Sequence, residues 1–123
     1  MARIFIYAKE DLAEQMALVL SMHGHSPICS EKMREALRQI ITFRPSIVIA
    51  EYLEIDGEQL CREIRKIKQL ENTQLIVMSE LGPNLNEDNF RSAVLAFRAN
   101  GYLRKPFPCQ EIASYVESWL RAS

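Results

Sequence analysis

Residues 100–107 read N-G-Y-L-R-K-P-F, and this segment decides how the rest of the chain is interpreted. Asn100-Gly101 is a pair that stops a helix, and Tyr102 and Leu103 begin a short strand behind it. Lys105-Pro-Phe-Pro108 then breaks the strand, because proline has no N–H to donate to a ladder. The segment therefore predicts a short strand between two helices, as in a parallel sheet with crossover helices.

Short apolar runs alternate with longer amphipathic segments over the rest of the chain as well. Four further strands are predicted, at Arg3–Tyr7, 27–29, 47–50 and 75–78. Apolar residues at helical spacing predict a helix after each of the five strands, the fourth from about Asn89 to Ala99. Right-handed crossovers then favour an α/β fold with a doubly wound, five-stranded parallel sheet in the order 2-1-3-4-5. That order places the second strand at an edge, where its proline is tolerated.

Local signals mark where some of these helices begin and end. Asp11 with Glu14, and Asp56 with Gln59, have the capping-box pattern of a helix start. Gly24 stands where a left-handed residue would end the first helix. We therefore predict that the first and third helices begin at these acidic residues.

The composition is that of an ordinary globular chain with almost no net charge. The 123 residues include 15 Lys+Arg and 16 Asp+Glu, which gives a formal net charge of −1. Neither nucleic acid nor a membrane surface is therefore an expected partner. No segment approaches the roughly 20 apolar residues of a membrane span, so we expect a single cytoplasmic domain over residues 1–123. A chain that ends directly after its last predicted helix is also what an N-terminal domain cut from a longer protein would look like.

Three cysteines, Cys29, Cys61 and Cys109, are an odd number and include no C-x-x-C pair. We therefore expect small buried side chains rather than a disulfide framework or a zinc site. If the last helix begins at Cys109, its N-terminus would lower the pKa of that thiol and make it the most reactive of the three.

In five motifs the chain resembles the receiver domains of bacterial two-component response regulators, and the resemblance covers essentially its whole length. The motifs are R-I-F-I-Y at the first strand, R-P-S-I-V-I-A-E at the third, D-G-E-Q-L-C-R-E-I-R at the third helix, L-I-V-M-S at the fourth strand and N-G-Y-L-R-K-P-F at the fifth. The last of them is the most specific. The resemblance implies a flavodoxin-like, three-layer sandwich and a role in signal transduction.

Phosphoryl transfer to such a domain needs an acidic pair that binds Mg²⁺, an aspartate nucleophile, a hydroxyl and a lysine. The resemblance places Ala8 and Lys9 at the acidic pair and Glu51 at the aspartate. A glutamate side chain is one methylene longer, which moves its carboxylate by about 1.5 Å, and in-line transfer tolerates little displacement. We therefore expect no phosphoryl transfer at Glu51, no Mg²⁺ and no other cofactor.

The other signalling positions are retained. The resemblance implies a phosphoryl-binding hydroxyl, an aromatic switch, and a lysine joined by a cis bond to a proline, and these are Ser79, Tyr102, Lys105 and Pro106. We predict that an ion pair between Glu51 and a lysine replaces the metal-bound, phosphorylated site and fixes one conformation. Lys9 and Lys105 are both candidates. In the alternative, Lys9 points to solvent and Glu51 pairs with Lys105 alone.

We expect an atypical receiver that is not phosphorylated, is not an enzyme and acts as a protein-interaction module. Family members signal through the surface of the fourth helix, fifth strand and fifth helix, where Tyr102 and Tyr115 offer contact area with a polar tip. The expected partner is a signalling protein or a downstream output domain, with a homodimer through the same surface as a further alternative. Residues 80–88, E-L-G-P-N-L-N-E-D, predict a polar loop that could bind a partner itself.

Two other functions stay open from the sequence. The chain would be an active receiver if Glu51 accepted a phosphoryl group, or if Glu10 and Asp11 formed a shifted acidic pair in the first turn of a helix. A cofactor-binding flavodoxin-like or redox module is the second alternative. Against it, the four glycines are isolated, so that no phosphate-cradling loop is present.

Overall fold

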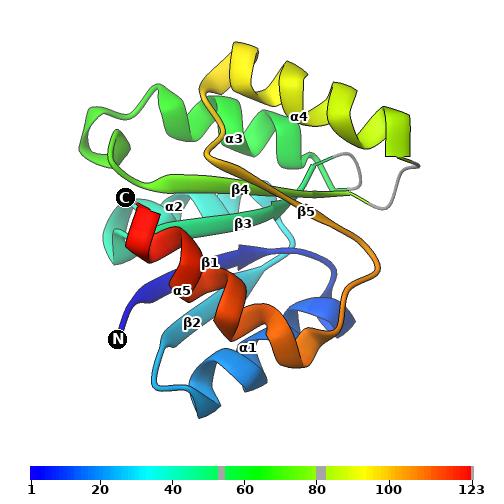
Figure 1. Ribbon diagram of the computed structural model, residues 1–123. Coiled ribbons are helices and arrows are strands. Elements are labelled where there is room, and N and C mark those ends of the chain that lie inside the picture. The colour runs from blue at the N-terminus through cyan, green and yellow to red at the C-terminus, as the bar shows by residue number, and fades with distance from the viewer. Residues whose placement is uncertain (53–54, 80–82, 123) are drawn as a thin grey trace.

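The computed structural model describes residues 1–52, 55–79 and 83–122. These residues form the strands β1 (Arg3–Tyr7), β2 (Ser26–Ser30), β3 (Ile47–Glu51), β4 (Gln74–Ser79) and β5 (Gly101–Arg104). The helices are α1 (Glu10–Met22), α2 (Met33–Phe43), α3 (Gly57–Arg65), α4 (Pro83–Phe97) and α5 (Ile112–Ala122), with short 3-10 helices at Lys68–Leu70 and Cys109–Glu111. Strands and helices thus alternate along the chain (Figure 1).

All neighbouring strands are parallel, and their order in the sheet is β2-β1-β3-β4-β5. This confirms the predicted order and the doubly wound topology. β2 lies at one edge, with Pro27 opposite Ile4 of β1. A proline costs little there, because an edge strand has one side without a strand partner.

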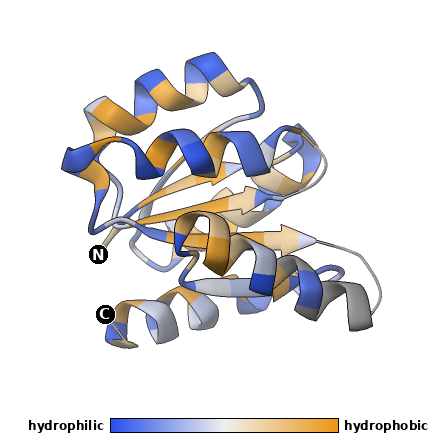
Figure 2. Ribbon diagram, turned by 90° about the horizontal axis from the view of Figure 1, so that it is seen from above, coloured by the Kyte–Doolittle hydropathy of each residue, from blue (hydrophilic) through white to orange (hydrophobic). Residues whose placement is uncertain are grey.

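The sheet separates the core into two layers. One face packs against α2, α3 and α4 through a cluster that includes Val48 and Val77. The other face packs against α1 and α5 through a cluster that includes Ile49 and Met78. Figure 2 shows orange, hydrophobic strands between helices that carry blue, hydrophilic residues. No helix in the described part of the chain is long and apolar enough to cross a membrane.

The predicted capping box of Asp11 and Glu14 is wrong. α1 begins at Glu10, so that Asp11 lies within its first turn, and the N-cap residue Lys9 makes no side-chain hydrogen bond to the helix. Instead, the Glu31 carboxylate just after β2 accepts the backbone N–H of Glu10 at 2.8 Å. A carboxylate near a helix N-terminus is stabilising, and here a different segment of the chain supplies it.

The predicted start of the third helix at Asp56 is confirmed, since Asp56 is the N-cap residue of α3, but the capping box of Asp56 and Gln59 is wrong. Asp56 makes no side-chain cap and has a left-handed backbone with φ at 60°. The backbone N–H of Glu58 is taken by the carbonyl oxygen of Tyr52 at 2.9 Å. The carbonyl group directly after β3 therefore accepts a backbone N–H at the start of α3, and no local side chain is needed as a cap.

The loop predicted over residues 80–88 is wrong from residue 83 onward. The backbone is helical from Pro83, where α4 begins, whereas residues 80–82 lie outside the described residues. Proline is favoured in the first turn of a helix, since its missing N–H would have no helical partner there. The proline that suggested a turn therefore starts a helix, and residues 83–88 do not form a binding loop.

Left-handed residues follow three of the helices, and after α2 the residue is Arg44, with φ at 51°. Gly24 follows α1 with φ at 84°, which confirms its predicted conformation. α4 ends at Phe97, earlier than the predicted Ala99, because Arg98 has φ at 58° and takes the chain out of the helix.

The predicted lowering of the Cys109 pKa is wrong. Cys109 lies in a 3-10 helix, and α5 begins only at Ile112. Burial raises the pKa of the Cys109 thiol, as it does for Cys29. Burial inside α3 raises the pKa of Cys61 to about 12.

Candidate functional site

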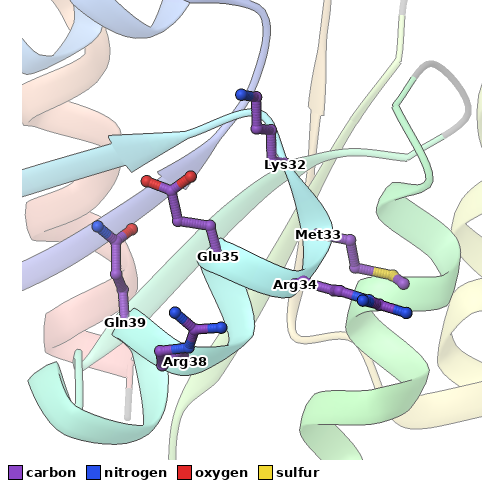
Figure 3. A pocket seen from close by; sticks show the side chains of 6 residues that line it. All are labelled: Lys32, Met33, Arg34, Glu35, Arg38 and Gln39. Atoms are coloured by element: carbon purple, nitrogen blue, oxygen red, sulfur yellow. The ribbon is translucent and has the colours of Figure 1, made fainter.

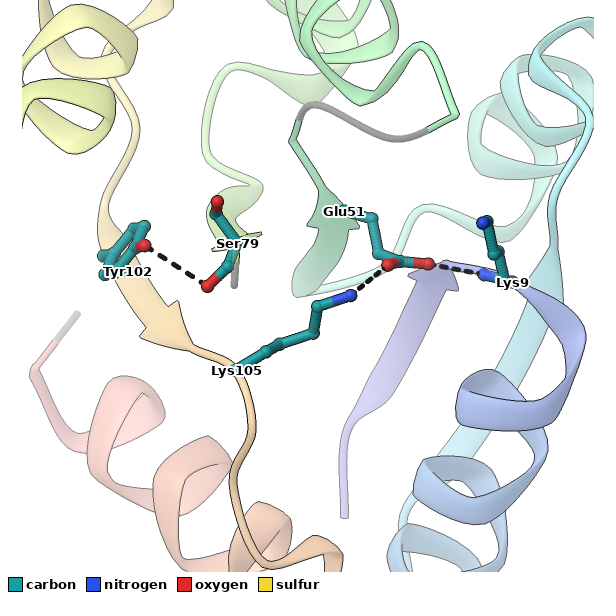
Figure 4. Close-up of polar contacts among 5 residues, drawn as sticks. All are labelled: Lys9, Glu51, Ser79, Tyr102 and Lys105. Carbon is teal, nitrogen blue, oxygen red and sulfur yellow. Dashed lines mark hydrogen bonds and ion pairs between the residues drawn. The ribbon is translucent and has the colours of Figure 1, made fainter. Parts of the chain in front are cut away.

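The side chains that the resemblance singles out lie where the carboxyl ends of several strands meet. Glu51 and Ser79 are the last residues of β3 and β4, and Lys105 follows β5. Figure 4 shows Lys105 and Lys9 on either side of Glu51. In doubly wound sheets this edge is where ligands and chemistry are found.

Both carboxylate oxygens of Glu51 have partners. Oε1 accepts the backbone N–H of Lys9 at 2.6 Å, and Oε2 forms a short, hydrogen-bonded ion pair with Nζ of Lys105. The side chains of Glu51 and Lys105 are only 2% and 12% exposed. Water and salt therefore screen this pair far less than a surface pair, although both groups have lost hydration.

The alternation of strand residues puts the two charges on the same side of the sheet. Ile49 packs in the layer of α1 and α5, so Glu51, two residues on, is directed the same way. Leu103 of β5 also packs in that layer, and Lys105 follows it by two residues. The Lys105-Pro106 peptide bond is cis, the conformation that the resemblance implies.

The end of β1 carries a small apolar residue and a basic one. Ala8 is 1% exposed in the layer of α1 and α5. Lys9 is exposed and contacts Glu51 through its backbone N–H. The hydrogen-bonded ion pair of Glu51 is therefore with Lys105, whereas Lys9 supplies a backbone donor.

Ser79 and Tyr102 are brought together on the opposite side of the sheet. The Tyr102 hydroxyl donates to the carbonyl oxygen of Ser79 at 3.4 Å, and the backbone N–H of Lys105 donates to the same oxygen at 2.9 Å. The Tyr102 ring packs against Phe90 of α4, with 6.1 Å between the ring centroids. Burial raises the pKa of the Tyr102 hydroxyl, so that it stays protonated and able to donate at neutral pH. Ser79 and Tyr102 are thus linked through the main chain of Ser79.

Gly57 lies directly against the main chain of Glu51, and it was not among the predicted site residues. A Cβ at this position would lie 1.7 Å from the carbonyl oxygen of Glu51, so that only glycine lets α3 approach β3 this closely. The next N–H, that of Tyr52, donates to the carbonyl oxygen of Met78 on β4 at 2.8 Å. The glycine directly after Asp56 was the sequence signal that could have found this contact.

Comparison with known proteins supports the resemblance. No protein-family model matches the chain. The response regulator MprA of Mycolicibacterium vanbaalenii is 29% identical over 110 residues, which cover 88% of this chain and 45% of that protein. Adventurous-gliding motility protein Z of Myxococcus xanthus is 29% identical over 113 residues, which cover 90% of this chain and 8% of that protein.

The solved structures include a signal receiver domain of a signal transduction histidine kinase from Syntrophus aciditrophicus. It has 25% sequence identity and a TM-score of 0.80, with 99% of this chain and 92% of that chain covered. The chain therefore has the receiver-domain fold and is similar in sequence to proteins of the response-regulator type. This receiver domain spans less than half the length of each of the two curated relatives named above.

The alternative acidic pair of the receiver domain lies apart from the ion pair. Glu10 and Asp11 are exposed in the first turn of α1. Glu10 lines a hollow of about 350 Å³ with Glu14 and Glu31, and Glu51 is not part of its lining. Among the residues that the structure describes, no group of three or more His, Cys, Asp or Glu side chains is arranged to hold a metal ion.

The two tyrosines predicted to contact a partner of the receiver domain are both half-buried. Tyr115 of α5 packs between Phe107 and Trp119, with ring centroids 6.4 and 6.2 Å away. Each tyrosine is therefore held by an aromatic neighbour and leaves part of its ring exposed, which suits a contact surface.

A larger hollow of the receiver domain lies along α2 and contains no residue of the Glu51 site. Its volume is about 730 Å³, and it is lined by Lys32, Met33, Arg34, Glu35, Arg38 and Gln39 (Figure 3). All six belong to α2 or directly precede it. This hollow is therefore a surface feature of one helix and is separate from the Glu51 site.

Proposed function

We propose that this receiver domain is an atypical one, which is not phosphorylated and acts as a protein-interaction module in signal transduction. The observation that carries the proposal is the buried ion pair of Glu51 and Lys105. An ammonium group bonded to the carboxylate supplies the neutralisation that a divalent cation provides in a phosphorylatable site. The pair would hold the site in one charge state without any exchangeable ion.

The residues present do not fit a Mg²⁺ site. Mg²⁺ takes oxygen ligands in near-ideal octahedral geometry, usually from one or two carboxylates together with waters. The two positions after β1 carry the buried methyl group of Ala8 and the cationic side chain of Lys9. The Glu51 carboxylate already accepts from an N–H and an ammonium group. We therefore infer that neither Mg²⁺ nor another cofactor takes part in the function.

The same contacts argue against Glu51 as a nucleophile. A carboxylate that attacks a phosphoryl group must offer an oxygen in line with the leaving group, and a misplacement of about 1 Å is costly. Oε2 is held by Lys105 and Oε1 by Lys9. We infer that the domain has no enzymatic activity and receives no phosphoryl group at this position.

Output would pass through the surface formed by α4, β5 and α5, which carries Tyr102 and Tyr115. Both rings are packed on one side and partly exposed on the other. We infer that this surface binds another signalling protein or an output domain, with a second copy of the chain as an alternative. The formal net charge of −1 argues against direct binding to nucleic acid or to a membrane.

Acetyl phosphate with Mg²⁺ tests the proposal, with intact-protein mass spectrometry as the readout. We expect no added phosphoryl group. The matched control is the triple variant Ala8→Asp/Lys9→Asp/Glu51→Asp, which restores the carboxylates and should gain one phosphoryl group under the same conditions.

A phosphoryl group on the unaltered chain would contradict the proposal and support the active alternative. Loss of that group in Glu51→Gln would then assign it to Glu51. Loss in Glu10→Gln/Asp11→Asn would show that the transfer depends on the shifted acidic pair.

A further inference from the structure

A basic groove lies between α3 and the end of α4, and none of its lining residues belongs to β5 or α5. Its volume is about 650 Å³, and we define it by its lining residues Gln59, Arg62, Arg65, Lys66, Leu95, Ala96, Phe97 and Arg98. Half of these residues are cationic and none is acidic. In a chain with a net charge of −1, this is a local concentration of positive charge.

Arg65 makes the groove rigid. Its guanidinium donates to the carbonyl oxygen of Phe97 at 2.9 Å, to that of Leu70 at 3.2 Å and to Oδ1 of Asn100 at 3.1 Å. These acceptors belong to the end of α4, to the 3-10 helix after α3 and to the residue that directly precedes β5. The walls of the groove are therefore tied to each other before any partner binds, which reduces the entropic cost of binding.

The positive charges in the groove are only partly balanced. Arg62 pairs with Glu58 at 2.7 Å, and Lys66 pairs with Glu63 at 3.0 Å. For Arg65 and Arg98, by contrast, no carboxylate lies within ion-pair distance among the described residues.

The two guanidinium groups without a carboxylate are close enough to interact. Burial lowers the pKa of Arg65, and the charge of Arg98 lowers it further. An anion placed in the groove would relieve this repulsion and form charge-assisted hydrogen bonds with the planar guanidinium groups.

The lining of the groove also includes an exposed apolar side chain. Leu95 of α4 lines it and is 82% exposed. A free phosphate or a nucleic-acid backbone would leave this leucine uncovered, whereas a peptide can place a carboxylate and an apolar side chain side by side. The combination of charge and apolar area therefore favours a peptide over a simple polyanion.

We propose that the basic groove binds an acidic segment of a partner protein, with a carboxylate of that segment on Arg98 and an apolar side chain on Leu95. This binding is independent of the Glu51 site. It gives the domain a second interaction surface on α3 and α4.

The test uses a fluorescein-labelled ten-residue peptide of aspartate and glutamate with one central leucine, and the full chain. We expect saturable fluorescence anisotropy that weakens with added salt. Arg98→Asn should weaken binding about fivefold to tenfold, because it removes one charge-assisted contact. Asparagine is chosen because it tolerates the positive φ at this position. Leu95→Ser should weaken binding by a similar factor.

Arg91→Gln is the matched control, since it removes one exposed positive charge from α4 outside the groove. It should leave the affinity within about twofold of the unaltered chain. Thermal unfolding of each variant checks that the fold is retained. Absence of saturable binding, or equal losses in Arg91→Gln and Arg98→Asn, would overturn the proposal. Tighter binding of a single-stranded oligonucleotide of equal charge would also overturn it, in favour of a polyanion site.

Discussion

The ammonium group of Lys105 forms an ion pair with the carboxylate of Glu51, 54 positions earlier in the chain. Because the pair is buried, loss of one charge and loss of both charges have different effects on stability. Replacing both charges by apolar or neutral groups costs a folded protein little, whereas removal of one partner leaves the other charge buried without compensation. A single substitution at position 51 or 105 is therefore costly, even where the intact pair itself contributes little to stability.

Lys105→Met should lower the free energy of unfolding by about 3 kcal/mol, because the Glu51 carboxylate then stays buried without a cation. Urea unfolding at neutral pH measures this loss. The double variant Glu51→Gln/Lys105→Met should recover most of it, since no charge is left in the site. Equal stabilities of the single and double variants would show that the pair does not act in this way.

Gly57→Ala should destabilise the fold by about 2 kcal/mol or more, because the new Cβ would lie 1.7 Å from the carbonyl oxygen of Glu51. The matched control is Gly24→Ala, where φ is 84° and no atom lies within 4 Å of the new Cβ. That change strains the backbone alone and should cost about 1 kcal/mol. If the two losses measured by urea unfolding were equal, the close approach of α3 to β3 would not be the cause.

Stability should decrease in alkaline solution because of Cys61. Burial raises the pKa of this thiol from 9.0 to about 12. Between these values the folded protein retains a proton that the unfolded chain releases, so the free energy of unfolding falls as the pH rises through this range. The thiol's contribution is complete below about pH 9 and lost near pH 12. Cys61→Ala should flatten the dependence of the melting temperature on pH, and an unchanged slope would contradict the prediction.

Mg²⁺ should produce no saturable heat in isothermal titration calorimetry with the unaltered chain. The physical reason is the donor set, in which Ala8 and Lys9 supply no carboxylate. The triple variant Ala8→Asp/Lys9→Asp/Glu51→Asp should bind Mg²⁺ and serves as the positive control. Saturable binding by the unaltered chain at micromolar to millimolar Mg²⁺ would contradict the prediction.

The strand order was predictable because a few residues exclude the alternatives. Pro27 requires an edge, and the continuous apolar runs at β3 and β4 require strands covered on both faces. The period of two along a strand then places Glu51 and Lys105 on one side of the sheet. The choice between Lys9 and Lys105 could not be made, because spacing does not say whether a residue meets its partner through the side chain or the main chain.

The helix starts were the least predictable feature, for a physical reason. An orphan N–H at the start of a helix can be satisfied by any nearby acceptor, and here Glu31 and the carbonyl of Tyr52 take the place of the local carboxylates. The start of α4 was missed because Pro83 favours both a turn and a first helical turn. Cys109 was misplaced since a 3-10 helix precedes α5.

The contact between Gly57 and the carbonyl oxygen of Glu51 also bears on how this receiver domain can vary. The main chain at position 51 is held between α3, which approaches it at Gly57, and β4, with which it pairs in the sheet. Exchange of a few side chains at the ends of β1 and β3 can therefore alter the chemistry without moving a strand. Under the proposed function, the unaltered chain and its triple variant Ala8→Asp/Lys9→Asp/Glu51→Asp would therefore share one backbone and differ only in side chains.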